Sequence, residues 1–156
     1  NVGRLLDRQG RRSEAEVEWA RALRYDPVLI HWIPEFQEAR ALAGQGKPEK
    51  AATLYEGLVE RYPMNPPLWI DLGNSYAMMK KPDDAMRAYQ KALYLFPGYL
   101  DALRSLGALA SDAGKSEMVD DVVVSLRKYF PGQPWVDQWE GSYRQKLAQF
   151  DSRGRR

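Results

Sequence analysis

Hydrophobic residues recur three and four positions apart along most of the chain. The pattern is clearest in LWIDLGNSYAMM, residues 68–79, and in AMRAYQKALYLF, residues 85–96. This spacing gives a helix one apolar face, whereas no segment alternates apolar and polar residues as a half-buried strand does. The pattern therefore predicts an all-α protein.

A short polar turn is repeated four times between these apolar stretches. It is written GRRSEA, GKPEKA, KKPDDA and GKSEMV, and the copies begin at residues 10, 46, 80 and 114, in steps of 36, 34 and 34. Glycine at the first position suits the left-handed conformation that ends a helix. The prolines and acids that follow suit the first turn of a new helix. Each turn is therefore predicted to end one helix and begin another, so the repeated unit is a helical hairpin.

One of these units carries a more specific pattern. Its first predicted helix contains Trp69, Leu72, Gly73 and Tyr76. Its second contains Ala85 and Tyr89, and Pro97 closes the unit. The pattern resembles the tetratricopeptide (TPR) repeat, W-x2-L-G-x2-Y then A-x3-F then P, with Tyr in place of Phe. The resemblance implies a right-handed α-solenoid of antiparallel helix pairs, a TPR superhelix, with a C-terminal capping helix.

The domain organisation follows from the same period. We expect a single TPR domain over residues 1–150, with a partial repeat at 1–27, repeats at 28–63, 64–97 and 98–131, and a capping helix at 134–150. Residues 151–156, DSRGRR, have no hydrophobic period and are expected to form a disordered basic tail. Because the first repeat lacks the start of its first helix, we expect a bacterial TPR domain cut from a longer chain.

Two sets of residues are expected to hold the last repeats together. Glycine recurs every 34 residues, at Gly73, Gly107 and Gly141, where a small residue would let helices pack closely. The capping helix carries one apolar stripe, formed by Val136, Trp139, Tyr143, Leu147 and Phe150. This stripe is predicted to face the preceding repeat, with the polar side of the helix toward solvent.

The first interval is two residues longer than the others. The additional residues fall in PVLIHWIP, residues 27–34, which is apolar for a connection. We expect this segment to pack over the junction as a widened corner; a partner-binding knob is the alternative. It contains His31, the single histidine. With no second histidine and no cysteine for a conventional zinc site, His31 is interpreted as a half-buried packing residue.

Composition and motifs argue against catalysis. The chain has no cysteine and a formal net charge of +2, and it contains no phosphate-binding loop or nucleophile-elbow motif. The acid pairs at 83–84 and 120–121 lie on predicted helices, where adjacent side chains diverge. We therefore expect no enzyme, no cofactor and no metal site. Interspersed charges argue against a nucleic-acid partner, and no segment has the length of a membrane span. The sequence does not indicate whether the location is cytoplasmic or periplasmic.

The TPR resemblance places the binding surface on the first helix of each pair, which lines a concave groove. The expected site consists of the residues off the packing stripe of these helices: Phe36, Gln37, Arg40, Ile70, Asp71, Asn74, Met78, Asp101, Arg104 and Ser105. Gln37 and Asn74 would bond the backbone of a peptide, and the arginines would pair an acid. TPR modules that hold the C-terminal carboxylate of chaperones carry cations where this chain has Asp71 and Asp101, so that class of partner is not expected.

The sequence therefore predicts a non-catalytic protein–protein interaction scaffold that binds a peptide segment or a partner helix. The alternative is a TPR module of a bacterial envelope protein for polysaccharide assembly or export, in contact with glycan or its machinery. In that case Trp135, Trp139 and Tyr143 would stack on sugar rings, if exposed. A third hypothesis is self-association through the open N-terminal repeat. Quenching of tryptophan fluorescence by glycans, and concentration-dependent sedimentation, would distinguish the three.

Overall fold

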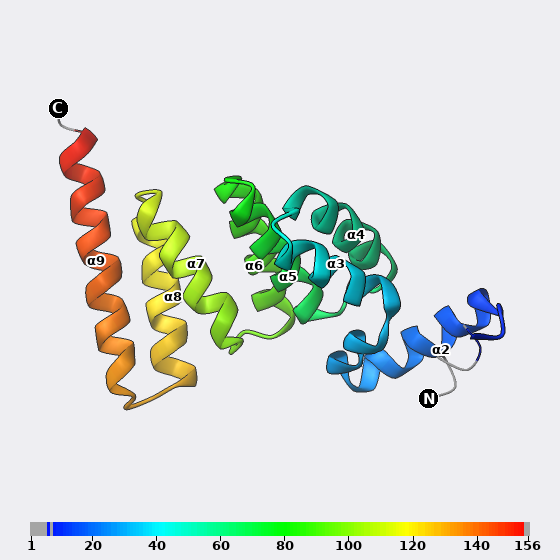
Figure 1. Cartoon of the computed structure of the whole chain (residues 1–156). Coiled ribbons are helices and arrows are strands. Elements are labelled where there is room, and N and C mark those ends of the chain that lie inside the picture. Colours follow the sequence, from blue (N-terminus) through cyan, green and yellow to red (C-terminus); the bar gives the residue numbers. More distant parts are fainter. Residues whose placement is uncertain (1–5, 7, 155–156) are drawn as a thin grey trace. The chain divides into compact units, whose positions relative to one another are not determined.

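The computed structural model describes residue 6 and residues 8–154, and the described residues form helices joined by short turns. The helices are α2 (Arg12–Tyr25), the 3-10 helix η1 (Pro27–Trp32), α3 (Pro34–Gly44), α4 (Pro48–Arg61), α5 (Pro66–Met78), α6 (Pro82–Leu95), α7 (Leu100–Asp112), α8 (Ser116–Tyr129) and α9 (Pro134–Gly154) (Figure 1). The prediction of an all-α fold built from helix pairs is confirmed. The chain divides into two compact units, unit 1 up to Ala88 and unit 2 from Tyr89 on, with the division inside α6.

The repeated polar turns end and begin helices as predicted. The backbone is left-handed at the first residue of each copy, with φ of 73° at Gly10, 71° at Gly46 and 70° at Gly114. Lys80 takes the equivalent place in the copy that lacks glycine, and its φ is 57°. Pro48 and Pro82 are the first residues of α4 and α6. The left-handed conformation thus recurs in every copy of the turn, including the copy in which no glycine removes the steric strain of a positive φ.

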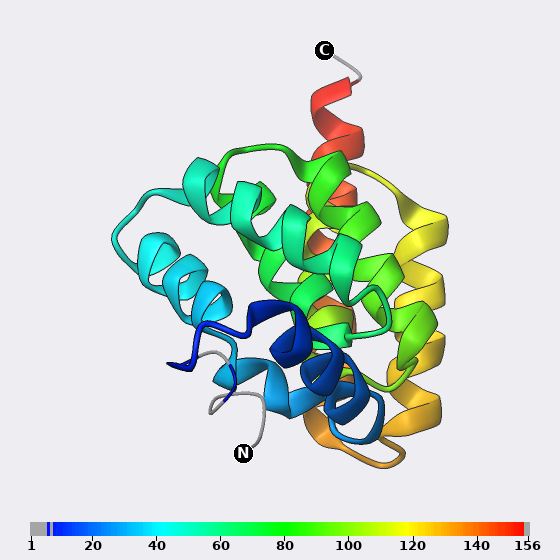
Figure 2. The same cartoon turned by 90° about the vertical axis from the view of Figure 1, so that its right-hand side faces the viewer.

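In unit 1, α3, α4 and α5 pack side by side, and η1 lies against α2, α3 and α5 (Figures 1 and 2). Short turns join α3 to α4 and α4 to α5, so consecutive helices run antiparallel. The core between them contains Phe36 of α3, Tyr55 and Leu58 of α4, and Leu68 of α5, all at most 1% exposed. Trp69, in contrast, is only half-buried, and its indole Nε1 donates a hydrogen bond to the Pro63 carbonyl at 2.8 Å.

The longer first interval is accommodated by η1. The carboxylate of Asp26 accepts a hydrogen bond from the Val28 amide at 3.0 Å and caps the start of this helix. Ile30 and Ile33 are buried, and the Asn65 side chain donates to the Pro27 carbonyl at 2.8 Å. The segment is therefore a packed corner, as expected, that ties the start of α5 to the chain entering α3.

In unit 2, α7 packs against both α8 and α9. The ring of Tyr143 on α9 lies directly over Gly107 of α7, and its hydroxyl donates to the Arg104 carbonyl at 3.1 Å. Burial raises the pKa of Tyr143 to about 12, so the hydroxyl keeps the proton that it donates. Ion pairs fasten α9 to α8 as well, since Arg127 contacts Glu140 at 2.6 Å and Arg144 contacts Asp120 at 2.6 Å.

The apolar stripe predicted for α9 is confirmed in its centre. Val136, Tyr143 and Leu147 are buried, and Trp139 is half-buried. Phe150 is 45% exposed, although its ring lies where a side chain on Gly114 would point.

Two expectations for α9 are wrong. Gly141 is exposed, and a Cβ on it would meet no atom within 4 Å, so this glycine does not serve close packing. The helix also does not end at Phe150. It continues through residues 151–154, which were expected to be disordered. No proline or glycine lies between Phe150 and Gly154, and the Ser152 hydroxyl donates to the Gln149 carbonyl. Residues 155–156 of the expected tail, and 1–5 and 7 of the first repeat, lie outside the described residues.

Candidate functional site

Two of the predicted groove residues are part of the core. Phe36 is 0% exposed, and its ring makes edge-to-face contacts with Tyr55 at 5.9 Å and His31 at 5.0 Å between centroids. Ile70 is 7% exposed. The expectation that Phe36 and Ile70 face a guest is therefore wrong, because both side chains are buried. Their contribution is to fix the helices that carry the polar residues of the site.

The exposed side of α3 carries Gln37 and Arg40, and both contact the corner helix η1. The Gln37 amide donates to the His31 carbonyl at 2.8 Å. The Arg40 guanidinium lies 3.3 Å from His31 Nδ1 and 5.9 Å from the centre of the Phe36 ring. His31 is exposed rather than half-buried, although its ring does pack on Phe36 as expected. These contacts hold Gln37 and Arg40 in defined positions at the surface.

Asp71 and Asn74 lie on α5, where Asp71 is half-buried and Asn74 is exposed. Burial raises the pKa of the Asp71 carboxyl above its ordinary value, while Arg40, His31 and a hydrogen bond with Asn74 act in the opposite direction. The same carboxylate helps raise the pKa of the buried Tyr55 hydroxyl, after burial itself. η1 packs against both α3 and α5, so the polar groups of the three helices lie in one region of unit 1. We call His31, Gln37, Arg40, Asp71 and Asn74 the α3–α5 polar surface.

The other predicted residues lie at the end of α5 and in unit 2. Met78, the last residue of α5, is 50% exposed and offers apolar surface. On α7, Arg104 pairs with Asp101 at 3.5 Å, both side chains being exposed, and Ser105 is half-buried. The Arg104 backbone is held by Tyr143, so this pair is carried by a well-packed part of α7. Asp101, Arg104 and Ser105 remain predictions as site residues.

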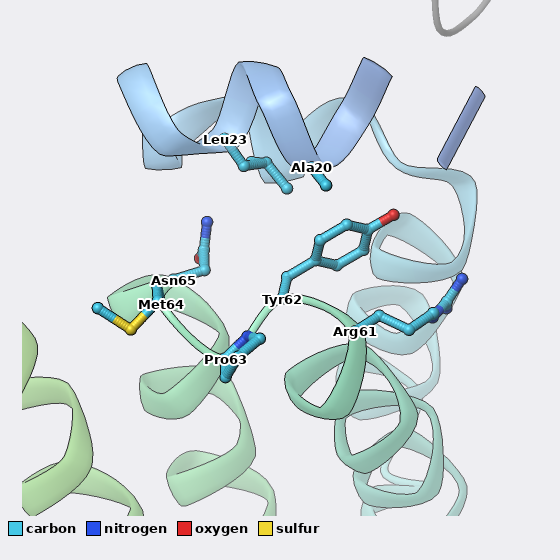
Figure 3. Close-up of a pocket in the computed structure, with 7 residues that line it drawn as sticks. All are labelled: Ala20, Leu23, Arg61, Tyr62, Pro63, Met64 and Asn65. Carbon is cyan, nitrogen blue, oxygen red and sulfur yellow. The ribbon is translucent and has the colours of Figure 1, made fainter. Parts of the chain in front are cut away.

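Unit 1 also contains an apolar recess of about 190 Å³ that none of the predicted site residues lines. Leu23 and Ala20 of α2 point toward the α4–α5 connection, where Tyr62 lies opposite them (Figure 3), and Pro63 and Met64 of the same connection also line the recess. The sequence analysis missed this recess, because its walls come from segments about 40 residues apart.

Three further observations on the described residues concern metals, sugars and membranes. They contain no group of three His, Cys, Asp or Glu residues that could hold a metal ion. Tyr143 is buried, and Trp135 and Trp139 are half-buried with their rings packed on each other at 4.7 Å. None of the described helices is both long enough and apolar enough to cross a membrane.

Comparison with known proteins identifies the repeat. Residues 36–100 match a family model described as tetratricopeptide repeat. No curated protein sequence matches the chain. Among solved structures, the second TPR domain of human RPAP3, in complex with the HSP70 peptide SGPTIEEVD, is 20% identical with a TM-score of 0.62, over 70% of this chain and 92% of that one.

Two further structures extend the likeness. MamA is 18% identical with a TM-score of 0.63, over 99% of this chain and 96% of that one. The third structure is the Yersinia enterocolitica type III secretion chaperone SycD in complex with a peptide of the translocator YopD. It is 12% identical with a TM-score of 0.61, over 77% of this chain and 92% of that one. At these identities the likeness is one of fold.

Proposed function

Because the chain is a tetratricopeptide-repeat protein, we propose that it is a non-catalytic scaffold that binds a peptide segment or partner helix of another protein. The α3–α5 polar surface is the proposed contact in unit 1. This surface is the observation that carries the proposal, since its polar groups are held in place before any guest arrives. A binding site that is already ordered loses less conformational entropy when a partner docks.

The chemistry of the surface suits a polypeptide backbone. The amides of Gln37 and Asn74 can both donate and accept hydrogen bonds, as the alternating N–H and C=O groups of a peptide require. Arg40 adds a fork of donors for a carbonyl or carboxylate. Met78 adds exposed apolar surface at the end of α5. A guest held in this way would be recognised by a few side chains and by its main chain.

The structural neighbours support a peptide as the guest class. The RPAP3 domain and SycD are each described in complex with a peptide of another protein. The HSP70 peptide ends in the acidic sequence EEVD, however, and this chain has acids at Asp71 and Asp101. Like charges disfavour binding, so we propose a different kind of peptide.

Peptide selection on the purified chain tests the proposal. Random 12-residue peptides displayed on phage would be selected on it, and a fluorescein-labelled copy of the best sequence titrated by anisotropy. We expect a micromolar Kd, about −8 kcal/mol. Replacing Gln37 and Asn74 together by alanine should weaken binding about tenfold or more. Both side chains are exposed, and losing the hydrogen bond of Asn74 to Asp71 costs about 1 kcal/mol, so the melting temperature should fall by only a few degrees.

The control removes two exposed amides elsewhere, by Gln138→Ala and Gln145→Ala on α9. This variant should bind the peptide as the wild type does. Selection without any enriched peptide, or equal binding by the Gln37→Ala/Asn74→Ala variant, would refute the proposal. Glycan contact and self-association through the N-terminal repeat stay predictions.

A further inference from the structure

The Asp71 carboxylate occupies a site that costs the fold free energy. It is half-buried on α5, which packs against α4, and burial raises its pKa. A carboxylate withdrawn from water is unfavourable unless a cation and hydrogen bonds compensate it. Asn74 supplies one hydrogen bond. A residue that costs stability at a surface suggests a role in binding.

Arg40, the cation that does most to lower the pKa of Asp71, compensates this carboxylate only in part. Arg40 is close enough to lower the pKa of Asp71, but the contacts of its guanidinium are with His31 Nδ1 at 3.3 Å and with the Phe36 ring at 5.9 Å. Gln37 is likewise occupied, since its amide donates to the His31 carbonyl. The carboxylate therefore keeps the capacity to accept hydrogen bonds from a further charged donor.

We propose that Asp71 selects the guest: the scaffold binds peptide segments that present one lysine or arginine side chain, which pairs with the Asp71 carboxylate. This inference rests on the proposed peptide-binding function and adds the chemistry of the partner. Charge complementarity carries it, because a half-buried carboxylate gains more from a cation than an exposed one. Arg40 disfavours a second cation nearby, so the preferred guest has a single basic residue rather than a basic tract.

The test compares peptides that differ in one side chain. The best selected 12-residue peptide would be synthesised with its basic residue as lysine, and with glutamine or glutamate in that place. The wild type should prefer the lysine peptide over the glutamine peptide about tenfold, equivalent to about 1.4 kcal/mol. It should bind SGPTIEEVD, which has no basic residue, more weakly than the lysine peptide. Raising the salt concentration should reduce the lysine preference.

Variants of the protein assign the preference to one residue. Asp71→Asn keeps the shape of the side chain and should bind the lysine and glutamine peptides equally. Asp71→Lys should reverse the order and favour the glutamate peptide. The matched control, Glu60→Gln, removes an exposed carboxylate from α4 of the same unit and should keep the lysine preference. Melting curves would confirm that each variant is folded.

The outcomes separate this inference from the function on which it rests. If selected peptides bind through Gln37 and Asn74, but Asp71→Asn leaves the lysine preference unchanged, the inference is wrong and the peptide-binding function stands. If no peptide depends on Gln37 and Asn74, both are wrong. A lysine preference that is lost in Asp71→Asn and reversed in Asp71→Lys supports both.

Discussion

Gly107 on α7 provides a sensitive test of how the helices of unit 2 pack. A Cβ placed on Gly107 would lie 2.6 Å from the Cε2 and Cζ atoms of the Tyr143 ring on α9. Ordinary van der Waals contact begins at 3.4 Å, so the Gly107→Ala substitution would require the ring to retreat by about 0.8 Å. Tyr143 is 5% exposed and its hydroxyl donates to the Arg104 carbonyl, so a retreat of the ring disturbs buried contacts and a hydrogen bond.

The free-energy change combines two opposing effects. Overpacking a core costs about 1–3 kcal/mol, whereas replacing glycine by alanine in a helix interior gains about 1 kcal/mol. The expected net result is a loss of about 1 kcal/mol in the free energy of unfolding. Gly141 is the matched control, because it lies one repeat length further on, within α9, with nothing near its Cβ position. Gly141→Ala should therefore gain about 0.5–1 kcal/mol.

Equilibrium unfolding in urea, followed by far-ultraviolet circular dichroism, measures both variants. With a typical dependence of about 2 kcal/mol per molar urea, the midpoint should fall by about 0.5 M for Gly107→Ala and rise by about 0.25–0.5 M for Gly141→Ala. The substitution Tyr143→Leu should remove most of the cost of Gly107→Ala, because the two residues are in contact. If Gly107→Ala raised the midpoint as Gly141→Ala does, the close approach of α7 and α9 at this point would be refuted.

Three further predictions concern other parts of the chain. Asp71→Asn should raise the melting temperature at neutral pH. Because the pKa of Asp71 is raised in the folded chain, wild-type stability falls as pH rises from the unfolded-state pKa of about 3.9 through the folded-state pKa. The gain in melting temperature should therefore vanish near pH 3, where the carboxyl group is protonated in both states. An equal gain at pH 3 and pH 7 would contradict this. Gly114→Ala should lower the free energy of unfolding more than Gly46→Ala does. Both glycines have a left-handed φ, which costs an alanine about 1–2 kcal/mol, but only Gly114 faces the Phe150 ring. Equal urea midpoints for the two variants would rule out that contact. In urea unfolding, Phe36→Ala should lower the free energy of unfolding by about 3–5 kcal/mol and Gln37→Ala by less than about 0.5 kcal/mol. Similar losses for the two variants would show that Phe36 is not in the core.

The helical repeat could be predicted because its determinants are local. A glycine or proline at a turn and an apolar residue every third or fourth position act within a few residues, so the boundaries near Pro48 and Pro82 follow from the sequence. Even the copy without glycine follows the period, since Lys80 adopts the left-handed conformation of Gly46 and Gly114.

The placement of the site residues was predicted less well, because side-chain direction depends on packing between elements. Phe36 was assigned to the groove by counting from the later repeats, but the longer first interval forms η1, and Phe36 packs into the core against His31 and Tyr55. The polar partners Gln37 and Arg40 were identified correctly as exposed, yet their contacts with His31 depend on the path of η1, which no local pattern specifies.

The central claim is that the polar groups of α3 and α5 contact a peptide guest. Titration of the nitrogen-15-labelled chain with the selected lysine peptide, followed by two-dimensional proton–nitrogen NMR, tests it most directly, because the side-chain amides of Gln37 and Asn74 give signals of their own. Those two pairs of signals should shift together with backbone signals of α3 and α5. Shifts confined to the recess beside Leu23 and Met64, or to α9, would contradict the claim.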